Sequence, residues 1–322
     1  MKKLAIGIDI GGTNTKFGCA DREGNVFFQD SILTTGHKDF NAYVHQLSSS
    51  IHQKISTLEG NPEIIGIGVG APNGNIYTGT IEDAPNLPWK TKIPLVNILE
   101  KEFKLPVILT NDANAAAIGE QVYGGAKDMK DFVVITLGTG LGSGIVANGQ
   151  LVYGHDGYAG ELGHVNVKPN GRQCGCGKRG CLETYASATG IQRTIYKLLA
   201  DYNTESELRD ISFNALNTKM ISDAAKRGDK IALQAFEYTG EILGRKLADT
   251  VVHTSPEAFF IFGGLANAGS LIINPTKQAM EDNLMSFYRN KIKIIPSGLD
   301  GAKAAILGAS SLIWKKYEEK QE

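Results

Sequence analysis

Three cysteines lie close together in the chain, with a spacing suited to metal binding or redox chemistry. Residues 174–181 read CGCGKRGC and place thiols at Cys174, Cys176 and Cys181. Three kinds of site use such a run: a glycine-rich dinucleotide loop, a redox thiol pair, or a metal site. The flanking sequence and the spacing decide among them.

The first two kinds of site do not fit. Gly175, Gly177 and Gly180 match the G-x-G-x-x-G spacing, but the preceding residues KPNGRQ have a turn composition where a dinucleotide fold needs a hydrophobic strand. A redox pair needs Cys-x-x-Cys, whereas this run has Cys-x-Cys and a third cysteine five positions later. A metal site remains.

A second set of candidate residues follows the ends of apolar strands. Asp9, Gly11, Gly12 and Thr13 end the strand predicted at 4–10. Glycines in such a turn let backbone amides converge on an anion, and a carboxylate can hold a water bound to Mg²⁺. Ordinary hairpin glycines are the alternative reading.

Similar turns follow two later strands. Gly138, Thr139 and Gly140 follow the apolar run that begins at 132, and Gly263 and Gly264 follow AFFIF. The chain has no Walker A motif, G-x-x-x-x-G-K-[ST]. Three glycine turns at matched strand ends would instead surround one nucleotide in a cleft.

Hydrophobic periodicity predicts the elements that position these residues. In the first part of the chain they are strands at 4–10, 17–20 and 26–31, a helix at 39–58, a strand at 64–70, a helix at 94–103, a strand at 107–110 and a helix at 113–121. In the second part they are helices near 183–200, 219–226 and 229–252, strands at 258–262 and 291–295, and a last helix from about 302.

The pattern of elements predicted at 4–20, a strand, a Gly/Thr turn and a second strand, is repeated at 132–152. We interpret this as an internal duplication of two α/β units, with two unrelated hairpins as the alternative. The predicted domains are a small N-terminal α/β domain at 1–121, completed by the C-terminal helix at 303–322, and a larger domain at 122–302.

Composition narrows the possible partners. The chain of 322 residues has 33 Lys and Arg against 34 Asp and Glu, so its net charge predicts neither a nucleic acid nor a membrane surface as the standing partner and favours a small ligand. Asp9 interrupts the N-terminal apolar run, and no stretch approaches the ~18 apolar residues of a membrane span. We therefore expect a cytoplasmic protein that binds no membrane. Cys19 is expected to be a buried hydrophobic residue.

The order of motifs resembles the superfamily of actin, sugar kinases and heat-shock chaperones, and within it the ROK family (repressor, open reading frame, kinase). The matching motifs are DIGGTN at 9–14, NDANAAA at 111–117, GTGLGSG at 138–144, GELGH at 160–164, CGCGKRGCLE at 174–183 and FGG at 262–264. The resemblance covers nearly the whole chain. It implies an actin-like/sugar-kinase ATPase fold, in which two facing duplicated α/β domains enclose a central cleft.

With His164, the three cysteines form a Cys₃His set, the closed tetrahedral complement of a structural Zn²⁺. The second ring nitrogen of a metal-bound histidine stays free to reach a sugar hydroxyl. In ROK sugar kinases the residues that match Glu161 and Glu183 accept hydrogen bonds from further hydroxyls. Structural salt bridges are the alternative role of these two glutamates.

The resemblance also implies a catalytic base. Asp112 matches the aspartate that accepts the proton of the attacking hydroxyl in the family, and Asn111 matches a sugar ligand. Asn86, in APNLPW, would add a hydrogen bond from the first domain. Taken without the family, Asp112 reads as an ordinary helix N-cap.

The function implied is ATP-dependent transfer of the γ-phosphate to the 6-hydroxyl of glucose, with Mg²⁺ and a structural Zn²⁺. Alternatives are a kinase for N-acetylmannosamine, mannose, fructose or allose, or a sugar sensor without catalysis. Repressors of the family carry a helix-turn-helix domain before the DIGGT motif, whereas eight residues precede Asp9 here, so we expect no DNA binding. The family also implies a homo-oligomer, either a dimer or a tetramer.

Overall fold

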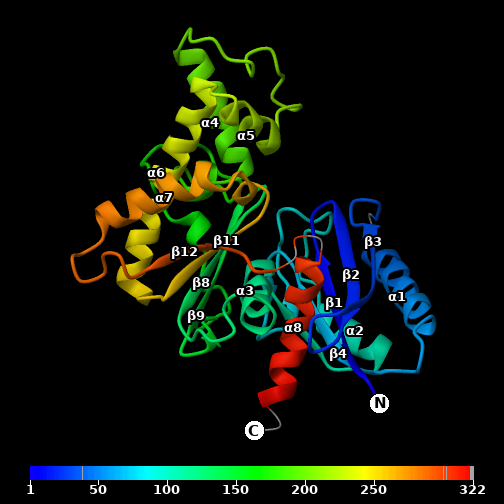
Figure 1. Ribbon diagram of the computed structural model, residues 1–322. Helices are drawn as coiled ribbons and strands as arrows, with labels where there is room; N and C mark the ends of the chain where they lie inside the picture. The colour runs from blue at the N-terminus through cyan, green and yellow to red at the C-terminus, as the bar shows by residue number, and fades with distance from the viewer. Residues whose placement is uncertain (38, 300, 302, 320–322) are drawn as a thin grey trace.

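Two mixed sheets divide the computed structural model of the chain into two lobes (Figure 1). The structure describes residues 1–37, 39–299, 301 and 303–319. The first lobe is built on strands β1 Lys3–Ile10, β2 Asn14–Ala20, β3 Val26–Leu33, β4 Glu63–Gly70 and β7 Val107–Thr110. The second is built on β8 Phe132–Leu137, β9 Leu141–Ala147, β10 Gln150–Leu151, β11 Ala258–Phe262 and β12 Lys293–Pro296.

The two sheets have the same topology. The first has the strand order β3-β2-β1-β4-β7 and the second the order β10-β9-β8-β11-β12. In each sheet the first three strands are antiparallel neighbours, and the following strands pair in parallel. The predicted duplication into two facing α/β units is therefore confirmed. A small ribbon, β5 Gly74–Asn75 with β6 Thr80–Ile81, extends from the first lobe.

Helices cover both sheets and fill the space between them. The helices of the first lobe are α1 Phe40–Ser56 and α2 Leu95–Phe103. Those of the second lobe are η1 Leu162–His164, η2 Leu182–Thr184, α4 Ala188–Asp201, α5 Thr218–Lys226, α6 Lys230–Thr254, η3 Ala266–Ala268 and α7 Ser270–Asn283. Two helices, α3 Asp112–Val122 and α8 Ala304–Glu319, lie between the lobes.

Alternation along β1 sends its side chains to two different layers. Leu4, Ile6, Ile8 and Ile10 join the core under α1 and α2, as their spacing predicts. The intervening residues face α8, which lies so close to the sheet that a Cβ on Gly7 would be 2.2 Å from the carbonyl oxygen of Ile306. This alternation also turns Asp9 away from α1 and toward the layer between the lobes.

The layer between the lobes has a core of its own. It combines alanines of α3 with Phe132 and Val134 of β8, Phe260 of β11, and Trp314 of α8. Helix α8 packs on β1, β2 and β4, so the end of the chain returns to the first sheet. The domain boundaries at 121/122 and 302/303 stay a prediction.

Two helical predictions need correction. The helix predicted near 183–200 starts only at Ala188, where Ser187 caps it by accepting a hydrogen bond from the Gly190 amide at 3.0 Å; residues 182–184 form the separate turn η2. Helix α7 was not predicted, because Pro275 lies inside it. Close packing on α6 stabilises α7: a Cβ on Gly244 would lie 2.2 Å from the carbonyl oxygen of Thr276.

Two smaller expectations are met. Cys19 is fully buried, and burial raises the pKa of its thiol to about 11. In the part of the chain that the structure describes, no helix is both long and apolar enough to cross a membrane.

Candidate active site

The end of β1 meets the start of α3 across a glycine. Asp9 pairs with Gly70, the last residue of β4. A Cβ on Gly70 would lie 3.4 Å from the Cα of Asp112 and 3.7 Å from Oδ1 of Asp9. Gly70 therefore lies beside both aspartates, at the point where the two elements meet. Burial, followed by the charge of Asp112, raises the pKa of Asp9 to about 6, whereas Lys16 lowers it.

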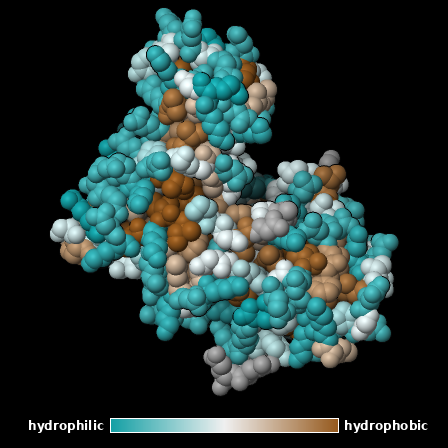
Figure 2. Space-filling view, in the orientation of Figure 1, coloured by the Kyte–Doolittle hydropathy of each residue, from teal (hydrophilic) through white to brown (hydrophobic). Residues whose placement is uncertain are grey.

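Asp112 is accessible to solvent but surrounded by protein. Its side chain is exposed, yet desolvation by the atoms packed around it raises its pKa, and the hydrogen bond from the Ala113 amide lowers it. The molecular surface is indented between the two lobes (Figure 2). The N-cap of α3 is Asn111, whose Oδ1 accepts from the Ala113 amide at 2.8 Å. The N-cap role proposed as the alternative for Asp112 thus falls to its neighbour.

Residues from the second lobe lie near enough to Asp112 to share its electrostatic environment. The pKa of Glu161 is raised by burial and, to a smaller extent, by the charges of Asp112 and Glu183. His164 lowers it, and the His164 Nε2 atom lies 3.9 Å from Oε2 of Glu161. The structure thus brings together the predicted base and three of the predicted sugar ligands, which the sequence separates by up to 71 positions, from Asp112 to Glu183.

Glu183 contacts both the second glycine turn and the cysteine loop. Its Oε2 accepts a hydrogen bond from the Leu141 amide at 3.1 Å, and its Oε1 accepts from the Cys174 thiol at 3.5 Å. A Cβ on Gly140 would lie 2.2 Å from Oε2 of Glu183, so a larger residue there would displace this carboxylate. The carboxylate thereby fixes the turn against the cysteine loop.

The first glycine turn lies against the loop that contains Asn86. A Cβ on Gly12 would be 2.8 Å from the Asn86 carbonyl oxygen, and the Gly11 amide closes the turn by donating to the Asn14 carbonyl oxygen at 3.0 Å. The Thr13 side chain is exposed next to this turn. Asp9, Gly12 and Asn86 therefore belong to one surface of the first lobe.

The second and third glycine turns are neighbours because β8 and β11 pair in parallel, with Thr136 opposite Phe262. Gly263 has a φ of +108°, and a Cβ there would lie 2.5 Å from the Leu137 carbonyl oxygen. Gly142 lies in β9, where a Cβ would be 2.9 Å from the Ala113 Cβ. That glycine allows α3 to pack closely on β9.

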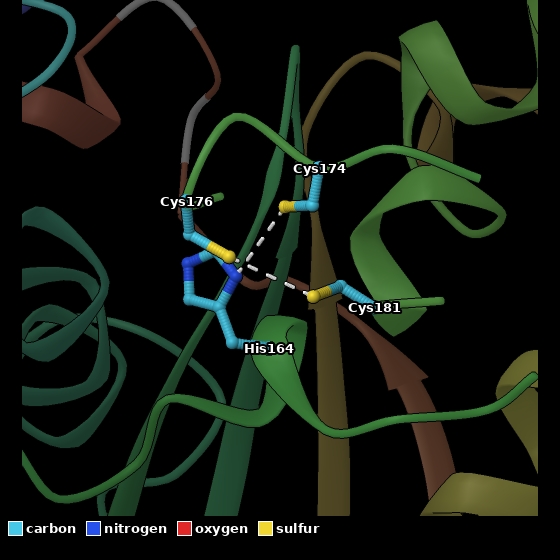
Figure 3. A group of neighbouring side chains, drawn as sticks. All are labelled: His164, Cys174, Cys176 and Cys181. Atoms are coloured by element: carbon cyan, nitrogen blue, oxygen red, sulfur yellow. Dashed lines mark hydrogen bonds between the residues drawn. The ribbon is translucent and has the colours of Figure 1, made fainter. Parts of the chain in front are cut away.

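The four predicted metal ligands form one cluster (Figure 3). Their ligand atoms all lie within 4.8 Å of one another. Nδ1 of His164 is 3.7 Å from Sγ of Cys174, and Sγ of Cys176 is 3.7 Å from Sγ of Cys181. In a tetrahedral site with Zn–S bonds of about 2.3 Å, two sulfur ligands lie about 3.8 Å apart. These two pairs therefore match the edges of such a tetrahedron.

Sequence reasoning missed a set of contacts between the lobes beside this site. Asn75 Nδ2 donates to the Asp156 carbonyl oxygen at 2.7 Å, Tyr77 OH to the Gly154 carbonyl oxygen at 2.9 Å, and Tyr158 OH to Glu82 Oε2 at 2.5 Å. We refer to these contacts as the clasp. Its partners are separated by 76 to 81 positions, and their residue types are ordinary for loops, so nothing in the sequence indicates the pairing.

Comparisons with known proteins agree with this geometry. The sequence profile of the ROK family matches residues 5–316. A glucokinase of Halalkalibacterium halodurans is 37% identical, over 98% of this chain and 96% of its own length. A xylose repressor of Caldicellulosiruptor bescii is 30% identical, over 96% of this chain and 77% of its own length.

Among solved structures, a ROK family glucokinase from Streptomyces griseus, in complex with glucose and AMPPNP, superposes with a TM-score of 0.80 at 32% identity. The match covers 97% of this chain and 99% of that one. The profile and the glucokinase relative each span nearly the whole sequence. The chain therefore belongs to the ROK family.

Proposed function

We propose that this protein is a glucokinase, which transfers the γ-phosphate of ATP to the 6-hydroxyl of glucose. The observation that carries the proposal is the meeting of Asp9, Asp112 and Glu161 between the lobes, in a chain that aligns with glucokinases over nearly its full length. The relative solved with glucose and AMPPNP supports both the sugar and the nucleotide.

Asp112 is proposed as the general base. Its raised pKa makes the carboxylate a better proton acceptor than an ordinary aspartate. Asn111 uses its side-chain oxygen to cap α3, which leaves its amide group to donate to a sugar hydroxyl. Glu161, His164 and Glu183 would hold hydroxyls from the second lobe, and Asn86 from the first. A sugar held from both sides would bring its 6-hydroxyl to Asp112.

The glycine turns are the proposed nucleotide site: Asp9 to Thr13 from the first lobe, and Gly138 to Gly140 with Gly263 and Gly264 from the second. Backbone amides in such turns bind phosphate oxygens. Bound Mg²⁺ would neutralise charge that develops on the transferred phosphoryl group. Asp9 would hold a water of that ion, and the positive charge would offset the proximity of Asp9 to Asp112.

We further propose that His164, Cys174, Cys176 and Cys181 hold a structural Zn²⁺. The observation is that four donors of the appropriate types lie within 4.8 Å of one another. A zinc ion held by four protein ligands has no open position for a reactive water. Nε2 of His164 faces Glu161, so the ring could donate on the sugar side. A reducing compartment such as the cytoplasm would keep the thiols available.

A sugar sensor without catalysis is the second candidate, favoured by the identity of 30% to a xylose repressor. These relatives leave nucleic-acid binding open. The identity of the preferred hexose and the dimeric or tetrameric state stay predictions.

The test is ADP release from Mg-ATP with glucose, mannose, fructose, N-acetylglucosamine or N-acetylmannosamine, alongside Asp112→Asn. We expect glucose to dominate, and we expect the substitution to lower kcat at least 100-fold, the smallest usual contribution of a general base. Asp83→Asn is the matched control: Asp83 is exposed with a φ of +47°, a conformation that asparagine adopts equally well.

Turnover of an N-acetylated sugar above glucose would keep the mechanism and reject the glucokinase assignment. No turnover of any sugar, with calorimetric sugar binding intact, would reject the kinase and favour the sensor. Full activity in Asp112→Asn would reject Asp112 as the base.

A further inference from the structure

The chain passes between the two sheets at two places. After α3 it runs to β8 through residues 123–131, and after β12 it leads back to α8; of this second crossing the structure describes residues 297–299, 301 and 303. Any rotation of one lobe relative to the other must be absorbed at these two crossings, because hinge motions concentrate in a few residues at the ends of elements.

One buried carboxylate is bonded to both crossings. Glu120, in the last turn of α3, is 1% exposed. Its Oε2 accepts from the Gly125 amide at 2.9 Å, which belongs to the first crossing. Its Oε1 accepts from the Gly298 amide at 3.1 Å and from the Ser297 hydroxyl, both in the second crossing. Bonds from N–H groups to a carboxylate are about twice as strong as neutral ones.

Glycines make room for this arrangement. A Cβ on Gly124 would lie 2.1 Å from Oε2 of Glu120, and a Cβ on Gly298 would lie 2.7 Å from the Gly125 nitrogen. The two crossings thus touch each other directly beside the carboxylate. Neither glycine has a positive φ, so the requirement at both positions is space.

The same helix connects this point to the proposed base. Asp112 is the first residue of α3, and Glu120 follows two turns later, about 12 Å along the axis. Gly119 packs against Gly308 of α8, where a Cβ would lie 2.9 Å from the Gly308 Cα. A short helix packed this closely moves as one body, so the orientation of α3 at the crossings also sets the position of Asp112.

We propose that Glu120 is a positioning residue that clamps the two crossings together and so sets the axis about which the lobes close on the sugar. The inference rests on the proposed function, since it assigns the closure to sugar binding. Without the clamp, the crossings bend independently, and the lobes lose the defined closed arrangement in which the sugar hydroxyl meets Asp112.

Two variants release the clamp by different chemistry. Glu120→Gln replaces one acceptor oxygen by an NH₂ group, which faces backbone N–H donors. Gly124→Ala keeps the charge and displaces the carboxylate by steric contact. For both, we expect kcat to fall and the KM for glucose to rise together, each about 10-fold, as hinge substitutions do. We also expect small-angle X-ray scattering to show less glucose-induced contraction than in the wild type.

The matched control is Asp21→Asn, which removes another buried carboxylate of the first lobe, one that pairs with Lys2 at 3.0 Å. It should lower stability and leave the kinetics and contraction unchanged. The proposal would be overturned if folded Glu120→Gln and Gly124→Ala proteins kept their kcat, their KM for glucose and their glucose-induced contraction within 2-fold of the wild type. If they fail to fold, Ser297→Ala removes a single donor; an unchanged KM and contraction in that variant would also overturn it.

Failure of the proposed function gives a different result. In that case the wild type itself would not phosphorylate glucose, whatever the variants do. If the wild type still contracts when it binds sugar and the variants do not, the clamp is supported even then, because scattering does not depend on phosphoryl transfer.

Discussion

At the scale of single residues, the site keeps two like charges close together at a cost to the fold. Asp9 and Asp112 come from different elements and approach across Gly70, and the ionised form of Asp9 is disfavoured by burial and by Asp112. A protein selected for stability alone would place an uncharged side chain there. The proposed Mg²⁺ and phosphoryl chemistry gives these carboxylates a reason to remain.

This arrangement predicts how stability depends on pH. The pKa of Asp9 is raised to about 6, so its protonated form favours the fold, and that contribution disappears as pH rises through 6. The free energy of unfolding of the wild type, relative to that of Asp9→Asn, should therefore fall by about 1 kcal/mol between pH 5 and pH 8. Urea denaturation in the presence of EDTA measures the difference.

The control for this prediction is Asp30→Asn. A hydrogen bond from Lys54 lowers the pKa of Asp30, so this carboxyl group is already ionised throughout pH 5 to 8. The difference in unfolding free energy between Asp30→Asn and the wild type should therefore not change over this pH range. A flat difference for Asp9→Asn as well would show that Asp9 is ionised in the fold at pH 5.

At the scale of elements, the position of α3 between the two sheets accounts for its many alanines. Its start carries Asn111 and Asp112, and its end carries Glu120. Between them, alanines pack on glycines of β9: a Cβ on Gly144 would lie 2.7 Å from the Ala117 Cβ. Small residues allow the helix to lie between two sheets, so that one short element reaches the site and both crossings.

We expect the cysteine loop, residues 172–181, to be ordered only when zinc is bound. Cys176→Ser removes one ligand of the proposed zinc site, so we expect bound zinc to fall from one per chain to less than about one tenth, because a hydroxyl is a poor zinc ligand. Amide hydrogen exchange across 172–181 should rise at the same time. Elemental analysis and exchange mass spectrometry measure the two effects without relying on activity.

Cys19→Ser is the matched control, since Cys19 is a buried thiol in β2 outside the cluster. It should keep one zinc per chain. A purified wild type that is folded and active with far less than one zinc per chain would rule out the structural role.

Elements with regular periodicity were predictable, and those set by tertiary contacts were not. The alternation in β1 and the helical spacing of Tyr43, Leu47 and Ile51 identify buried faces directly. Helix α7 escaped prediction because Pro275 argues locally against it, while its packing on α6 lies outside any sequence window. The motifs predicted a set of site residues, several of which the structure brings together. The clasp and the Glu120 contacts, in contrast, depend on partners far away in the sequence.

At the scale of the whole molecule, the lobes are joined by more than the two crossings. The clasp connects the β5–β6 ribbon and Glu82 of the first lobe to residues 154–158 of the second, and both segments lead directly into predicted sugar ligands, Asn86 and Glu161. Glu82 is the most strongly held of these groups, because hydrogen bonds from Lys92, Tyr158 and Thr80 lower its pKa to about 2. The clasp therefore holds the two lobes together beside the site.

Tyr158→Phe removes one hydrogen bond of the clasp and leaves the ring in place. The bond is partly exposed and is worth about 0.5–1 kcal/mol, so the KM for glucose should rise about 2- to 5-fold with little change in kcat. Glu82→Gln should have a similar effect. The double variant should be no worse than the more impaired single variant, because Glu82→Gln weakens the same contact that Tyr158→Phe removes. Tyr202→Phe, at the end of α4, is the control. Additive losses in the double variant would show that the two residues act separately, and the clasp would then not hold the lobes through this bond.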